Sequence, residues 1–196
     1  VFLCGLCLLA ASCAGPVPAS DGGREVSGGP SRDAAQTTAP ASSLPVVEDL
    51  LPVEEYSDPR QEEITHIVVH FMSAVRDHPE NPYDWPANRQ IFLDAGVSSH
   101  YVIERDGTIR RLIPEERVAW HAGKGSWLGD ERYTDRMNQY SVGIELLGIG
   151  TGEEMAAYMT PEEYAQLPQE LLGFTDEQYA SLQALIGDIR RRHPGI

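Results

Sequence analysis

The chain has 196 residues, 41% of them hydrophobic and 23% charged, which is enough for one globular domain with a sizeable core. Thirty acidic residues against 15 basic ones give a formal net charge of −15. Such a surface repels phosphate backbones and lacks the basic character of an anionic-lipid-binding face. We therefore expect neither a nucleic-acid partner nor a polybasic membrane-binding surface.

The first 13 residues have the features of an export signal. Val1–Ala11 is an apolar run too short to span a bilayer comfortably, and small residues follow it. The stretch ending at Cys13 resembles a lipoprotein signal, in which the cysteine carries lipid after cleavage. Three alternatives stay open: a lipid anchor at Cys13, secretion without lipid, and a buried N-terminal segment. No cysteine follows Cys13, so the body of the chain has no thiolate metal ligand.

Residues 14–50 are predicted to form a flexible linker, since Gly, Ser, Ala, Pro and Thr dominate most of the segment without an apolar period. The folded domain is predicted to span residues 51–196. A tether behind an export signal indicates an extracytoplasmic location, either anchored to a membrane or secreted to the cell envelope.

Several segments of the domain read as strands. Ile64–Met72 and Ser141–Ile149 are mostly apolar and β-rich, which predicts buried strands. Ser99–Arg105 and Thr108–Ile113 flank Asp106-Gly107, a strong signal for a β-hairpin.

Helix signals accompany these strands. A helix over Asn88–Ala95 is expected to stop at Gly96, and Thr160 precedes a proline and a reciprocal glutamate at a second helix start. Thr175 and Gln178 repeat that cap for a last helix, whose apolar face comprises Leu182, Leu185, Ile186 and Ile189. The elements together predict a single α/β domain with a mixed central sheet flanked by helices.

Two further segments are less clear. Lys124–Gln139 is polar with interspersed aromatic residues, which fits a cleft-side loop and a solvated surface loop equally well. Gly150–Phe174 is predicted to be a helical insertion that covers the outside of the domain.

Four features carry potential chemistry: His70, His100, the run Trp120-His121-Ala122-Gly123, and Glu145. A buried, unpaired carboxylate is strongly unfavourable, so Glu145 within its apolar strand must reach a metal, a cation or a cleft. The residues alone leave other interpretations open, namely histidines that are satisfied within the core and a salt-bridged strand carboxylate. His66 is expected to be structural or at a rim, and His78 has no predicted role.

Five blocks in this order resemble the zinc-dependent N-acetylmuramoyl-L-alanine amidases, which are related to phage lysozyme-type amidases and peptidoglycan recognition proteins. The resemblance extends from about residue 60 to the end. The blocks are residues 66–70, 97–103, 106–108, 119–123 and 138–146.

The resemblance implies roles for individual residues. His70 matches a zinc ligand, and Glu145 matches the acidic residue beside the zinc-bound water. His100, Trp120, His121 and Asn138 match positions associated with the substrate cleft. The remaining metal ligands and an oxyanion-stabilising lysine are expected beyond Ile196, and His193 is not taken as a substitute.

The implied reaction is zinc-dependent hydrolysis of the amide bond between N-acetylmuramate and L-alanine, with peptidoglycan or a muropeptide as substrate. Zinc lowers the pKa of its water, and Glu145 takes the proton as general base. The resemblance also admits a non-catalytic peptidoglycan-binding module on the same fold. We expect the protein to be a monomer.

Overall fold

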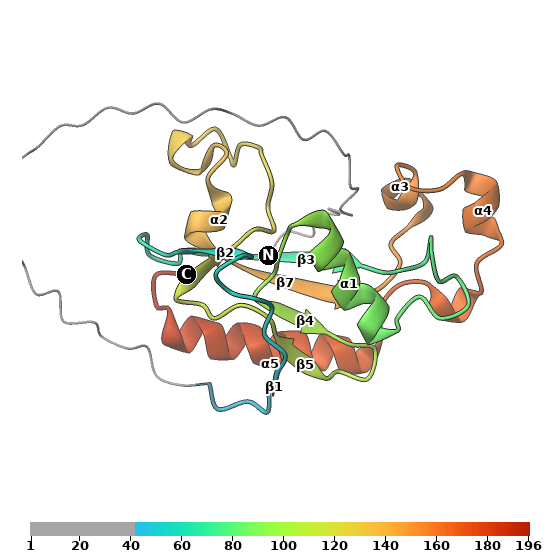
Figure 1. The fold of residues 1–196 in the computed structure, drawn as a ribbon, viewed down its shortest axis with the longest axis horizontal. Coiled ribbons are helices and arrows are strands. Elements are labelled where there is room, and N and C mark those ends of the chain that lie inside the picture. The colour runs from blue at the N-terminus through green and yellow to red at the C-terminus, as the bar shows by residue number, and fades with distance from the viewer. Residues whose placement is uncertain (1–41) are drawn as a thin grey trace, which may run out of the picture.

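The structure is a computed structural model that describes residues 42–196 (Figure 1). The predicted export signal, with Cys13, and most of the predicted linker lie outside the described residues. In the part of the chain from residue 42 onward, no helix combines the length and the apolar character needed to cross a bilayer.

Five strands form a mixed sheet in the order β1-β5-β4-β7-β3. Strands β4 and β5 are antiparallel, as the predicted hairpin requires, and the other neighbouring strands are parallel. Strands β2 and β6 form a separate antiparallel pair. The bounds are β1 Val47–Glu48, β2 Ser57–Pro59, β3 His66–Met72, β4 Tyr101–Ile103, β5 Ile109–Arg111, β6 Arg117–Ala119 and β7 Ser141–Leu147.

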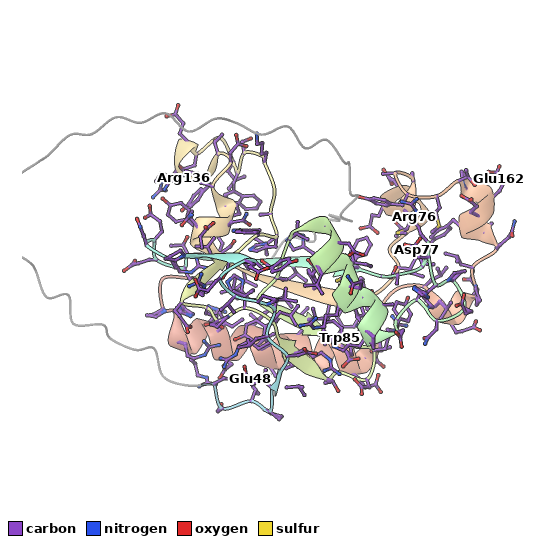
Figure 2. The ribbon with its side chains drawn as sticks, viewed as in Figure 1. Glu48, Arg76, Asp77, Trp85, Arg136 and Glu162 are labelled. Carbon is purple, nitrogen blue, oxygen red and sulfur yellow. The ribbon has the colours of Figure 1, made fainter. Side chains whose placement is uncertain are left out.

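Two longer helices, α1 (Trp85–Ala95) and α5 (Asp176–Arg192), lie on opposite faces of the sheet (Figure 1). The shorter helical elements are η1 Glu131–Tyr133, α2 Met137–Tyr140, α3 Gly152–Met155, α4 Pro161–Ala165 and η2 Gln169–Leu171. In Figure 2, Arg136 marks the lobe that carries α2 and Glu162 marks α4, with α1 between them. The prediction of an α/β domain with a mixed sheet between helices is confirmed.

The core is divided by the sheet into two clusters. On the α5 side, Val69 and Ile144 pack in a cluster with Leu185. On the α1 side, Val102 packs in a cluster with Phe92. Each strand therefore contributes alternate residues to the two faces, as the pleat requires.

The predicted helix ends follow from local capping. Gly96 ends α1 in the left-handed conformation, at φ 64°, and Thr175 forms a reciprocal capping box with Gln178 at the start of α5. Helix α1 begins three residues before the predicted start, because the Asp84 side chain accepts a hydrogen bond from the backbone N–H of Ala87.

The predicted linker is too long at its C-terminal end. Val47 and Glu48 form β1, which pairs with β5, and Leu51 is 2% exposed. A strand of two residues is too short to show an apolar period in the sequence. Glu48 is held by an ion pair at 2.7 Å with Arg111, a residue far along the chain. The domain therefore begins before residue 51.

Candidate active site

His70 and Glu145 lie next to each other on neighbouring parallel strands. They are Cα partners in the pairing of β3 with β7, and both are buried, with 2% and 3% of their surfaces exposed. Their chain neighbours Val69 and Ile144 belong to the cluster on the α5 side. Because side chains alternate along a strand, His70 and Glu145 both project from the other face of the sheet.

His121 completes a group of three on this face. Its Nδ1 lies 3.1 Å from Nε2 of His70, and its Nε2 lies 3.1 Å from Oγ of Ser141. A Cβ atom on Gly143 would lie 2.5 Å from the His121 ring, so the ring rests where only glycine leaves room. Burial, followed by the proximity of His70 and His100, lowers the pKa of His121 well below its ordinary value. The imidazole is therefore neutral.

The Glu145 carboxyl group has an unusual environment. Its Oε2 atom is buried and has no hydrogen-bond partner among the described residues. Burial raises the pKa of Glu145 to about 8, so the protonated form is favoured at neutral pH when no cation is near. A cation on this face would favour the carboxylate, which makes the group suited to a site that gains positive charge.

His100 is fully buried and bonded to the backbone. Its Nδ1 accepts from the N–H of Gly143 at 3.0 Å, and its Nε2 donates to the carbonyl of Arg117 at 3.1 Å. Burial, then the guanidinium of Arg60, lowers the pKa of His100 to about 3. The ring thus joins β4 to β6 and β7 as a neutral group. Its predicted contact with substrate stays a prediction that full burial does not support.

A pocket of about 530 Å³ opens beside His70. Its charged lining residues are Lys124 and Arg190, and neither Asp nor Glu lines it, although the chain as a whole is strongly acidic. The predicted loop of residues 124–139 contributes much of the wall, so its placement beside a cleft is confirmed. The other lining residues are Thr65, His66, Ile67, Val68, Ala122, Gly123, Gly125, Ser126, Trp127, Tyr133, Met137, Ile186 and Ile196.

Aromatic rings form one part of this pocket. The ring centroid of His66 lies 4.7 Å from that of Tyr133 and 6.1 Å from that of Trp127, both in edge-to-face geometry. The sequence predicts a structural or rim position for His66, and the residue lines the pocket. The three rings offer flat apolar surface close to His70, which suits a ligand with an apolar face.

Trp120 and Asn138 lie near the site without lining the pocket. The Asn138 side-chain oxygen accepts from the backbone N–H groups of His121 and Ala122, at 3.1 and 2.7 Å. The Trp120 indole donates to Asp58 at 2.8 Å. Both side chains therefore hold the loop that carries His121, and their predicted contacts with substrate remain untested.

Arg60 is a residue that sequence reasoning missed. Its guanidinium donates to the backbone carbonyls of Glu115, Gln139 and Ser141 at 2.8, 2.5 and 3.0 Å, and so ties three segments together behind the site. Burial lowers the pKa of Arg60 to about 10, which leaves it charged at neutral pH. An arginine in a polar segment before a strand gives no signal of such a role.

The described residues provide part of a metal site. The imidazole of His70 and an unpartnered carboxyl oxygen at Glu145 are groups that suit zinc. Among residues 42–196, however, no group of three or more His, Cys, Asp or Glu side chains could hold a metal ion together. The two residues fit zinc in kind without forming a complete ligand set.

The sequence matches the N-acetylmuramoyl-L-alanine amidase family over residues 60–196, which is most of the described chain and includes every site residue above. The chain belongs to this family. The match begins at Arg60, the residue that ties the segments behind the site.

Individual relatives agree with this assignment. The 1,6-anhydro-N-acetylmuramyl-L-alanine amidase AmpD of Citrobacter freundii is 36% identical over 100 residues, which cover 51% of this chain and 41% of that protein. The N-acetylmuramoyl-L-alanine amidase AmiD of Escherichia coli K12 is 35% identical over 92 residues, covering 43% and 32%. The matched region thus spans less than half the length of these curated relatives.

A solved structure supports the fold. The crystal structure of a Se-Met AmpD derivative superimposes with a TM-score of 0.54 and 27% identity, covering 77% of this chain and 76% of that one. The predicted amidase-like architecture, a mixed sheet with flanking helices in one domain, is confirmed.

Proposed function

We propose that the protein hydrolyses the amide bond between N-acetylmuramate and L-alanine in peptidoglycan or in muropeptides derived from it. The observation that carries the proposal is the pairing of His70 with Glu145 on one face of the sheet, with a carboxyl oxygen left without a partner. Membership of the amidase family supports the same reaction, because AmpD and AmiD are both named as amidases of this bond.

We further propose that the reaction depends on zinc, with His70 as one ligand and with further ligands that the described residues do not provide. When bound, zinc would act as a Lewis acid and lower the pKa of a water molecule towards about 7. A divalent cation beside Glu145 also favours the ionised carboxylate over the neutral acid. A bound cation would therefore lower the pKa of Glu145 from its raised value in the metal-free fold, and the ionised carboxylate could accept a proton.

Glu145 acts first as a base and then as an acid in this scheme. Its carboxylate takes a proton from the water whose oxygen attacks the amide carbonyl carbon, and a C–O bond forms. When the C–N bond breaks, the same carboxyl group delivers the proton to the leaving amine of L-alanine. The burial of Glu145 keeps this proton from exchanging freely with solvent.

The proposal is tested by digesting peptidoglycan with the full-length protein and analysing the products by mass spectrometry. Stem peptides with a free L-alanine amine are expected, and their release should fall about 100-fold or more in Glu145→Gln. Glu116→Gln removes an exposed carboxylate of the same domain and serves as the matched control. Cleaved sugar linkages would contradict the proposal, and binding without any product would identify a non-catalytic binding module instead.

We propose an extracytoplasmic location, for which the apolar run Val1–Ala11 and Cys13 are the support. The protein is expected in the membrane fraction if Cys13 is lipidated. Cys13→Ser should then abolish incorporation of a labelled fatty acid and release the protein from that fraction. Recovery of the unaltered protein from the cytoplasm would contradict an extracytoplasmic site of action.

A further inference from the structure

The pocket beside His70 is a groove along the outer edge of the sheet. Strand β3 is the last strand in the order of the sheet, and within residues 42–196 it pairs only with β7. Four consecutive residues, Thr65–Val68, line the pocket together with His70. Because consecutive side chains of a strand point to opposite faces, a pocket that touches all four must reach around this edge from one face of the sheet to the other.

Two walls enclose this groove, and each wall carries one cation. In Figure 1, α5 and the lobe of residues 122–140 lie on opposite sides of the sheet. Helix α5 contributes Ile186 and Arg190 to the lining, and the lobe contributes Lys124 and Trp127. A ligand that follows the edge of β3 therefore passes between an ammonium group on one side and a guanidinium group on the other.

These two cations differ from their neighbours because they have no anionic partner. Neither Lys124 nor Arg190 forms an ion pair or a hydrogen bond with another described residue. In contrast, Arg136 of the same lobe pairs with a glutamate at 2.9 Å, and Arg191 pairs with an aspartate. Acidic residues outnumber basic ones by 30 to 15 in the chain, yet none of them lines the groove. Charge complementarity therefore favours an anionic ligand here.

We propose that the groove binds the stem peptide of the substrate, with carboxylates of the peptide held by Lys124 and Arg190. The outer edge of a terminal strand presents backbone N–H and C=O groups with which an extended peptide can pair. From His70 back to His66 the strand spans about 13 Å, the length of about four extended residues.

The direction of the peptide rests on the proposed amidase function. If the amide bond is cut beside His70, the peptide on the leaving-amine side can run along β3 towards Thr65, through the groove and between the two cations. A free peptide ends in a carboxylate, which is the group that the cations would recognise. Lys124 and Arg190 are thus specificity-determining residues for an acidic peptide, and neither takes part in the chemical step.

The direct test measures binding of a soluble muropeptide to the full-length protein by calorimetry, with a chelator present so that no hydrolysis interferes. Two probes are compared: a muropeptide whose stem peptide has free carboxylates, and the same muropeptide with those carboxylates amidated. The free form is expected to bind about 10-fold more tightly, because exposed ion pairs contribute up to about 5-fold each. Equal affinity for the two probes, or binding of neither, would overturn the proposal.

Variants locate the preference in the groove. Lys124→Gln and Arg190→Gln should each weaken binding of the free form about 3- to 5-fold and leave binding of the amidated form unchanged. Lys124→Arg keeps the charge and should keep the preference. Arg136→Gln is the matched control, because it removes one positive charge from the same lobe at a residue that does not line the pocket. An equal loss in Arg136→Gln would show a general electrostatic attraction and overturn the assigned site.

Inorganic phosphate distinguishes a peptide site from a site for any small anion. An excess of phosphate should not displace the free-carboxylate muropeptide, because phosphate has no backbone to pair with β3. Displacement by phosphate would overturn the assignment to a peptide.

The proposed function fails in a different way from this proposal. Carboxylate-dependent binding without release of stem peptides, once zinc is restored, would reject the amidase reaction and leave the peptide site standing. Hydrolysis with equal KM for the free and the amidated muropeptide would instead leave the amidase reaction standing and overturn the role of Lys124 and Arg190.

Discussion

The imidazole ring of His121 packs on the backbone of Gly143 in β7, the strand that also carries Glu145. A methyl group on Gly143 would lie 2.5 Å from two ring carbons, closer than van der Waals contact allows. We predict that Gly143→Ala destabilises the domain by about 1–3 kcal/mol, because one of the two must move in a packed core. Denaturant unfolding measures the change.

Gly187→Ala is the control for this substitution. Gly187 lies within α5, and nothing lies within 4 Å of a Cβ placed there. Alanine should stabilise this helix by roughly 0.5–1 kcal/mol. Equal changes in unfolding free energy at the two positions would show that the close contact of Gly143 with His121 does not restrict the residue at position 143.

The raised pKa of Glu145 predicts a pH-dependent stability of the metal-free protein. Its folded-state pKa of about 8 lies above the ordinary 4.5, so between these values the folded state binds more protons than the unfolded state. Stability should therefore fall as the pH rises from about 4.5 to 8, by an amount on the order of a few kcal/mol.

Glu145→Gln, which cannot ionise, should remove this fall and be the more stable protein at pH 8. Unfolding titrations of both proteins at pH 5 and pH 8, with a chelator present, give the comparison. If the difference in unfolding free energy between the two proteins is the same at both pH values, Glu145 is ionised in the folded state.

The buried ion pair of Glu115 and Arg192 predicts the opposite pH dependence. Burial alone would raise the pKa of Glu115, but hydrogen bonds from His193, Arg192 and Tyr101 lower it to about 2. The stability contributed by the Glu115 carboxylate is thus present above pH 4.5 and lost as the pH falls towards 2.

Glu115→Gln should destabilise the domain at pH 7 by about 2 kcal/mol or more, since it leaves the buried Arg192 without this partner. The difference from the unaltered protein should shrink at pH 3. Glu116→Gln, the exposed neighbour, should have little effect at either pH. A difference that grows on acidification would contradict the assigned pKa.

The aromatic part of the pocket predicts an effect on substrate binding. Tyr133→Ala removes a ring that contacts His66, and we expect KM to rise about 10-fold with kcat little changed. Tyr179→Ala, which removes a half-exposed tyrosine of α5, is the control. Steady-state kinetics with a soluble muropeptide decide the outcome, and a fall in kcat alone would contradict a binding role for Tyr133.

The sequence predicts those parts of the fold that local chemistry determines. Gly107, at φ 84°, makes the hairpin turn where Asp106-Gly107 indicated it, and the Thr175 capping box starts α5 as expected. Strands β1, β2 and β6 could not be predicted in this way. Each has two or three residues, and each exists because a partner distant in the sequence supplies its hydrogen bonds.

The same distinction applies to the site. His70 and Glu145 stand out because polar groups within apolar strands are unusual, and the resemblance to a family indicated a shared location. The roles of Ser141 and Arg60 depend on contacts between segments distant in the sequence. The Ser141 hydroxyl lies 3.1 Å from the His121 ring, and Arg60 donates to the carbonyls of Glu115 and Ser141 at 2.8 and 3.0 Å. No spacing along the chain encodes such contacts, so these residues became visible only in the structure.

The pairing of β3 with β7 also determines when the site can form. His70 and Glu145 come from strands separated by α1, the β4–β5 hairpin and the lobe of residues 122–140, so they meet only after a long chain segment has closed into a loop. Parallel pairing of distant strands forms slowly, because the entropy of loop closure is lost before the contacts are gained. A nascent or partly folded chain that lacks β7 therefore has the imidazole but no carboxyl group beside it, so the proposed hydrolysis requires the completed sheet.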